Sequence, residues 1–264
     1  MTTKWRGEED GIKCSVDGIS IDEFQLLDST QYNSIQAFDS DTNICIFAKL
    51  SQELCREHLI KKKNWGLTSV RRFAKAAMEY KPDVQRGQKC GGENTAYKIF
   101  GTRKNPLDSG VGEYAFKPNT DNEKQRQLIK QAQNIVKRLE KAAQVISKPL
   151  LEEKSVIKTI SQWIKQGIGE FATALSVGKG YHSICHVDND FYYTVLTVAA
   201  PSKEFDEEII YYFCFPEYSV KVPLKSGDIL VFNPQILHSC SNPKMKGSFI
   251  MSAYVSAKTV LSAA

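Results

Sequence analysis

The feature of this sequence that most constrains its fold is a change of hydrophobic period after Gly167. From there to Ser256, short segments rich in β-branched and aromatic residues follow one another, separated by glycine, proline or acidic turns and without a helical repeat between them. Strands are predicted over 171–177, 182–187, 191–199, 209–215, 219–222, 228–232 and 248–256. Short strands in such close succession form an antiparallel sandwich or barrel.

The residues before Gly167 follow a helical period instead. Apolar residues recur at steps of three and four between Leu128 and Ile146, which predicts a long helix over about 121–147, with Thr120 and Glu123 at the capping-box spacing. Helices are also predicted over 50–60, 69–80 and about 156–164, a buried strand over 43–49, and loops with short strands over 85–119. The chain is therefore expected to be an α+β protein with a partly irregular segment 1–42, a helical part 43–167, a β-core 168–258 and a tail 259–264.

Composition places the chain among ordinary globular proteins. Hydrophobic residues make up 42% of its 264 residues and charged residues 25%, and no stretch approaches the roughly 18 apolar residues of a membrane span. The opening MTTKWRGEED has no apolar core of a secretory signal. Seven cysteines, without a Cys-x-x-Cys pair, argue against a disulfide scaffold and a structural zinc site. We expect an intracellular protein of the cytoplasm or nucleus, neither secreted nor membrane-bound.

Residues that bind metals gather on two of the predicted strands. His186 is followed two positions later by Asp188 in CHVDND, and residues two apart on a strand point to one face. His238 comes after SGDILVFNPQIL, in which a turn, a strand and a second turn would bring the chain back beside that pair. Two imidazoles and one carboxylate on one face, with open positions opposite, are the ligand set of non-haem Fe(II) oxygenases. The sequence therefore predicts a metal site at His186, Asp188 and His238.

Two alternatives stand beside this prediction. The plain one is a pair of ordinary strand-end histidines with a turn aspartate, because a His-x-Asp triplet alone is a weak signal. The other is that His182 is a ligand, but on a strand it lies roughly 13 Å along the chain from His186, too far to share one ion. His182 is therefore assigned to the pocket wall or to the core.

At these residues the sequence resembles the superfamily of 2-oxoglutarate- and Fe(II)-dependent dioxygenases. Gly180 and Tyr181 precede the His-x-Asp, the run from Gly227–Asp228 through a strand to Asn233–Pro234 precedes His238, and GSFIMSAYVS forms the final strand. The resemblance covers about 171–256, a third of the chain, and its branch stays open between prolyl-hydroxylase-like and nucleic-acid-oxidising enzymes. It implies a double-stranded β-helix (a jelly-roll or cupin-like core) with the N-terminal helices packed on it. It also implies Fe(II) and 2-oxoglutarate as cofactors, and oxidation of a substrate through a ferryl species with release of succinate and CO2.

The sequence departs from this family at the residue that binds the far carboxylate of 2-oxoglutarate. The family places an arginine on the last strand, nine to fifteen residues after the distal histidine and often as Arg-x-Ser, whereas this chain has no arginine after Arg138. The best replacement is Lys246-x-Ser248, expected on one strand face, with Tyr181 as a second contact. The alternative is that Lys246 is a solvated turn residue, in which case the cosubstrate differs, ascorbate being one candidate reductant.

The substrate stays open between a protein side chain, a nucleic acid and a small molecule. Nucleic acid is suggested by Arg56–Lys89, where ten basic residues stand against three acidic ones, although a solvated helical face explains the same pattern. We considered two functions of other classes. One is a cupin-like metal-binding protein without turnover. The other is a nucleic-acid-binding module, or an enzyme oxidising methylated bases, that grips phosphate through Lys61–Lys63, Trp65, Arg71, Arg72 and Lys75.

Overall fold

The computed structural model describes the β-core almost completely and the rest of the chain in parts. The described residues are 5–7, 14–16, 19–20, 25–26, 34–39, 41–42, 45–53, 55, 66–80, 87–90, 93–104, 111–113, 122–146, 168–170 and 172–256. Most of the helix predicted over 50–60 and all of the one predicted over 156–164 lie outside these residues.

The C-terminal part of the chain forms two facing antiparallel sheets. Its strands are β10 (Ala174–Lys179), β11 (Ser183–His186), β12 (Asp190–Ala199), β13 (Ile209–Phe215), β14 (Val220–Lys225), β15 (Ile229–Phe232), β16 (His238–Cys240) and β17 (Phe249–Ser256). The order β15-β12-β17-β10 lies within the larger sheet, and β11-β16-β13-β14 lies within the smaller one. Apart from the hairpin β13–β14 within the smaller sheet, successive strands alternate between the two sheets, and this is a double-stranded β-helix. The α+β class and the β-helix core predicted from the sequence are confirmed.

Strands from the N-terminal half extend the larger sheet at both edges. The strand β6 (Cys45–Leu50) pairs with β15 on one side and with β5 (Ser34–Phe38) on the other, while β8 (Glu93–Lys104) pairs with β10 at the opposite edge. The strand β6 confirms the buried strand expected there. The sequence did not indicate the length of β8, twelve residues within a glycine-rich region expected to be loops with short strands.

Smaller strands complete the β structure. The strands β7 (Gly87–Cys90) and β9 (Val111–Glu113) pair with β8, and β4 (Gln25–Leu26) pairs with β14 in the smaller sheet. A separate three-stranded sheet consists of β1 (Trp5–Gly7), β2 (Cys14–Val16) and β3 (Ile19–Ser20).

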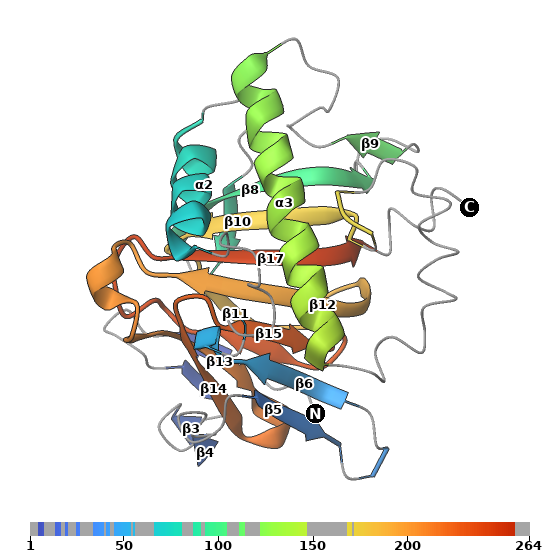
Figure 1. The fold of residues 1–264 in the computed structure, drawn as a ribbon. Coiled ribbons are helices and arrows are strands. Elements are labelled where there is room, and N and C mark those ends of the chain that lie inside the picture. The colour runs from blue at the N-terminus through green and yellow to red at the C-terminus, as the bar shows by residue number, and fades with distance from the viewer. Residues whose placement is uncertain are drawn as a thin grey trace.

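Two helices cover the outer face of the larger sheet, as Figure 1 shows: α2 (Leu67–Glu79) and α3 (Glu123–Ile146). Both match predicted helices to within two residues. The start of α3 is capped by Asn122, whose side-chain oxygen accepts the N–H of Gln125 at 3.2 Å. Thr120, expected as the cap, lies outside the described residues. None of the described helices has the length and apolarity that crossing a lipid bilayer requires.

Strand alternation gives the larger sheet two different faces. Residues such as Leu175, Val177 and Met251 are buried in one core with Leu139 and Phe73 of the helices. Their neighbours in sequence point the other way, into the space between the sheets, where a second core forms around the aromatic side chains Phe47, Phe213, Phe215 and Phe232. The helices therefore shield the back of the sheet, and the space between the sheets is left for the site.

A buried ion pair ties β6 to the turn before β15. Lys49 Nζ lies 2.9 Å from Asp228 Oδ2, and the two side chains are 5% and 4% exposed. The Asp228 carboxylate also accepts the backbone N–H groups of Gln52 and Lys225, each at 3.0 Å, while Lys49 donates to the carbonyl of Pro223 at 2.7 Å. The aspartate of the Gly-Asp turn therefore has a structural role.

Candidate metal centre

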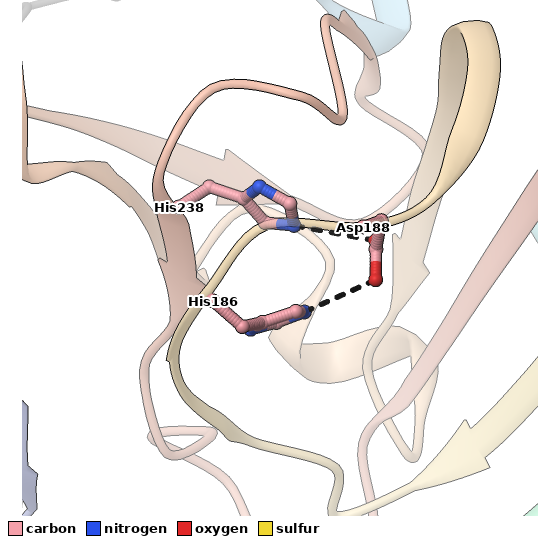
Figure 2. Close-up of side chains that lie close together, drawn as sticks. All are labelled: His186, Asp188 and His238. Carbon is pink, nitrogen blue, oxygen red and sulfur yellow. Dashed lines mark ion pairs between the residues drawn. The ribbon is translucent and has the colours of Figure 1, made fainter.

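The two histidines face each other across neighbouring strands. The strand β11 ends at His186 and β16 begins at His238, and the antiparallel register places these residues directly opposite each other. Their ring centroids are 4.5 Å apart. Figure 2 shows both rings turned toward Asp188. An antiparallel pairing between two strands about 50 residues apart in sequence thus brings the predicted ligands together.

Asp188 completes the group from the loop that follows β11. Its carboxylate oxygens lie 3.6 Å from His186 Nε2 and 3.4 Å from His238 Nε2. The loop is held in place because the Asp188 N–H donates to the carbonyl of Pro234 at 2.9 Å. One ligand atom from each of the three residues lies within 4.8 Å of the others. Asp188 therefore reaches the site from a fixed loop, one position beyond the strand end predicted from the sequence.

Hydrogen bonds fix which nitrogen of each imidazole is free. The Nδ1 atoms of His186 and His238 each lie 2.7 Å from a backbone carbonyl, that of Ile184 and that of Ile236. A carbonyl oxygen only accepts, so each Nδ1 carries the hydrogen and each Nε2 keeps its lone pair. Both lone pairs are directed at the space beside the carboxylate. This is the arrangement in which metal-binding histidines are usually held.

The electrostatics of His186 and Asp188 favour the forms that bind a cation. Burial and the neighbouring His238 lower the pKa of His186, so its imidazole is neutral at neutral pH. Burial by itself would raise the pKa of Asp188, but its interactions with His238 and His186 outweigh burial and hold that pKa below its usual value. A neutral imidazole and an ionised carboxylate are the protonation states that a divalent metal requires.

The site is closed on one side and open on the other. The His238 side chain is 3% exposed and lies against two aromatic rings, stacked on Phe213 at 5.4 Å and edge-on to Phe232 at 4.9 Å. The side chains of His186 and Asp188 are 33% and 39% exposed. The aromatic side keeps water away from His238, and the open side leaves a path by which a ligand can reach the metal.

A cavity of about 330 Å³ between the two sheets contains the three residues. Its wall from the larger sheet includes the hydroxyl side chains Ser176, Thr194, Ser252, Tyr254 and Ser256. Its carboxylates are Asp188 and Asp190, and no lysine or arginine is among the described residues that line it. The cavity is therefore polar and, apart from its acidic groups, uncharged.

The three residues expected to bind the cosubstrate lie in different places. Tyr181 lines the cavity, packed over Gly178, where an added Cβ would stand 2.9 Å from the Tyr181 Cβ. Lys246 is exposed in the turn before β17 and is not among the cavity residues. Ser248 is buried but donates its hydroxyl to the Met245 carbonyl at 2.8 Å. The prediction that Lys246 and Ser248 share a strand face is wrong, because β17 begins at Phe249.

The physical reason lies in the turn itself. Gly247 has φ = 88°, a left-handed conformation that interrupts an extended strand. The inward positions of β17 that fall nine to fifteen residues after His238 are therefore Ile250 and Ser252. Neither can supply a positive charge to the cavity.

Other predicted residues lie away from the cavity. His182 lies in the loop before β11. It is not among the described residues that line the cavity, so it does not form part of the pocket wall, one of the two places expected for it. Within the basic segment 56–89, α2 packs on the helix-covered face of the larger sheet, opposite to the face that carries the cavity. There Arg71 forms a half-buried ion pair with Asp206, whereas Arg72 and Lys75 are exposed. Lys61–Lys63 and Trp65 lie outside the described residues.

Several cavity residues were not indicated by the sequence, and Thr194 is the clearest case. The strand β12 is interrupted by a bulge between Phe191 and Val195, where Tyr192 has φ = 64°. The register shifts by two residues across the bulge, so the alternation keeps its phase and Asp190 and Thr194 both line the cavity. The signal that could have marked Thr194 as an inward position is the alternation counted backward from Val198.

Comparisons with known proteins support the fold. No protein-family model and no curated protein matches the chain. Among solved structures, NgTET1 in complex with 5mC DNA matches with a TM-score of 0.53 and 13% identity, over 89% of this chain and 82% of that one. An oxidoreductase of the 2OG-Fe(II) oxygenase family from Burkholderia pseudomallei matches at 0.44 and 6%, over 72% and 79% of the two chains. The collagen prolyl hydroxylase of Paramecium Bursaria Chlorella virus-1 matches at 0.34 and 14%, over 79% and 94%.

At 13% identity and a TM-score of 0.53, the likeness to NgTET1 shows the fold alone. This chain has the double-stranded β-helix fold of the 2-oxoglutarate- and Fe(II)-dependent oxygenases, and its His-Asp-His group fits the facial triad of such enzymes. The resemblance stated from the sequence is confirmed at that level. The donor set, the free Nε2 atoms and the ionised Asp188 fit Fe(II). The far end of the described cavity offers no cation to a dicarboxylic acid such as 2-oxoglutarate.

Proposed function

We propose that this protein is an Fe(II)-dependent oxygenase that uses a 2-oxo acid, 2-oxoglutarate in the first instance, to oxidise an organic substrate. The observation that carries the proposal is the pairing of His186 with His238 across two strands, with Asp188 facing both rings, inside a β-helix cavity. Three protein ligands on one side leave positions for other ligands on the other.

Each part of the site has a function in this proposal. Fe(II), when bound, supplies a centre at which O2 is activated toward a C–H bond of the substrate. The carbonyls of Ile184 and Ile236 orient the imidazoles, and the Pro234 carbonyl positions the loop of Asp188. Phe213 and Phe232 exclude water from the His238 side. The substrate approaches on the open side, where His186 and Asp188 are accessible.

Formation of succinate tests the proposal against a metal-binding protein without turnover. We expect the purified protein with Fe(II), ascorbate, O2 and 2-oxoglutarate to release succinate slowly in the absence of a substrate, and the His238→Ala variant to release none. A protein that binds one Fe(II) through the same residues but forms no succinate would instead be a cupin-like binding protein.

Nucleic acid is a second candidate substrate, for which two observations speak. They are the likeness in fold to NgTET1, which was solved with 5mC DNA, and the ten basic residues between Arg56 and Lys89. Against it stands the acidic character of the described cavity wall. Binding of fluorescent DNA and RNA oligonucleotides between about 50 and 200 mM salt tests this candidate, because several phosphate contacts would cost orders of magnitude in affinity over that range. Binding that Lys61–Lys63→Glu leaves unchanged would remove it.

A further inference from the structure

Among the described residues that line the cavity, no positively charged side chain is present to attract the second carboxylate of 2-oxoglutarate. The described charged side chains of the cavity wall are those of Asp188 and Asp190, both acidic. Two positive charges of Fe(II) are balanced by Asp188 together with the C1 carboxylate of a chelating 2-oxo acid. A further carboxylate at the far end of the acid would be desolvated beside groups of its own sign.

Thr194 offers an unused hydrogen-bond donor in this cavity. Its side chain is 2% exposed, and its hydroxyl oxygen has no hydrogen-bond partner among the described residues. It stands directly across the strands from Phe232, whose ring packs against His238. Buried hydroxyl groups normally have a partner, so one that lines a cavity beside a metal ligand is available to a bound molecule.

Other neutral donors surround the same wall. Leu196, the next inward residue of β12 after Thr194, faces Ser252 across the strands, and Ser252 in turn faces Ser176. Tyr181 reaches the cavity from the loop after β10. Hydroxyl groups bind a carboxylate, a carbonyl or another hydroxyl about equally well in geometric terms, because they rotate to suit the acceptor.

We propose that the far end of the cosubstrate acid is held by uncharged hydroxyl donors, with Thr194 as the principal one, and that this cavity does not require a second carboxylate on the 2-oxo acid. The inference rests on the proposed function and specifies its cosubstrate. It makes Thr194 a binding residue of the reaction. It also predicts that a monocarboxylic 2-oxo acid of similar length replaces 2-oxoglutarate.

Anaerobic titration of the Fe(II)-loaded protein tests this through the visible absorption of the chelated 2-oxo acid, which does not depend on turnover. The two probes are 2-oxoglutarate and 2-oxopentanoate, which has the same five-carbon chain with a methyl group in place of the second carboxylate. We expect 2-oxoglutarate to bind about tenfold more tightly at most, because its far carboxylate accepts a hydrogen bond from a hydroxyl group but forms no ion pair. A buried carboxylate with a cationic partner would give a preference for 2-oxoglutarate of more than about a hundredfold.

Matched variants separate the role of Thr194 from a general effect on the fold. Thr194→Val should weaken 2-oxoglutarate binding by about tenfold, the value of one hydrogen bond to a charged group, and Thr194→Ser should restore it. Thr197→Val is the control, because Thr197 is also buried and unpartnered on β12 but is not among the cavity residues. Lys246→Met should bind both acids normally.

The outcomes distinguish this inference from the proposed function. A hundredfold preference for 2-oxoglutarate, or normal binding by Thr194→Val, would overturn the inference and leave the oxygenase proposal intact. A protein that binds Fe(II) but neither acid would overturn both.

Discussion

Removal of the buried Asp228 carboxylate should destabilise the protein strongly without touching the metal ligands. In Asp228→Asn one carboxylate oxygen becomes an NH2 donor, while Lys49 Nζ, 2.9 Å away, and the N–H groups of Gln52 and Lys225 still need acceptors. Breaking one partner of a buried ion pair costs about 3–5 kcal/mol, a large share of the roughly 5–15 kcal/mol by which domains are stable. Lys49→Met should lose a similar amount, because it leaves the carboxylate buried without its cation.

The assay is urea unfolding followed by tryptophan fluorescence and circular dichroism, with the double variant Lys49→Met/Asp228→Asn completing the cycle. Since the two groups interact directly, the double variant should lose clearly less than the sum of the single losses. Single variants within about 0.5 kcal/mol of the wild type, a value typical of surface positions, would refute the reasoning. So would losses that simply add.

Three further predictions concern other described positions. Glu140→Gln should lower the free energy of unfolding by about 1–3 kcal/mol, because the buried carboxylate accepts the N–H groups of Glu170 and Ala172 at 3.0 and 3.1 Å. Urea unfolding measures this loss, and an unchanged unfolding midpoint would contradict the prediction. Gly101→Ala should lower the melting temperature by several degrees, since φ at this position is 105° and the new Cβ would stand 2.3 Å from the Thr173 carbonyl oxygen. A melting temperature equal to that of the wild type would contradict this prediction. His182→Ala should leave Fe(II) affinity unchanged, as judged by anaerobic titration, and a weaker affinity would make His182 part of the site.

The sequence predicted the β-core well because its strands alternate with clear turns. The strand β13 was predicted with its observed bounds, and the other core strands except β16, which was given no range, were predicted to within three residues. His186 and His238 could be paired in advance because the turns around β15 limit where the chain can return. Asp188 was identified from the His-x-Asp spacing, although β11 ends at His186 and Asp188 reaches the site from the loop that follows.

The unpredicted features depend on interactions between distant segments or on local backbone geometry. The strand β8 lies in a glycine-rich region and pairs with β10, about 75 residues later, and no local sequence pattern reports such a pairing. Lys246 was placed on a strand because the left-handed Gly247 that ends the turn looks like any other glycine in a sequence. Thr194 was not singled out because strand alternation marks inward positions but does not report which of them border the cavity.

The measurement that tests the account most directly is anaerobic Fe(II) binding to the wild type and to His186→Ala, Asp188→Ala and His238→Ala, with His182→Ala as the matched control. We predict one Fe(II) per chain for the wild type and the control. Each ligand variant should remain folded and lose about a hundredfold or more in affinity, since even residues that only orient metal ligands contribute 10–100-fold. A folded ligand variant that binds Fe(II) as tightly as the wild type would contradict the assignment of the metal centre.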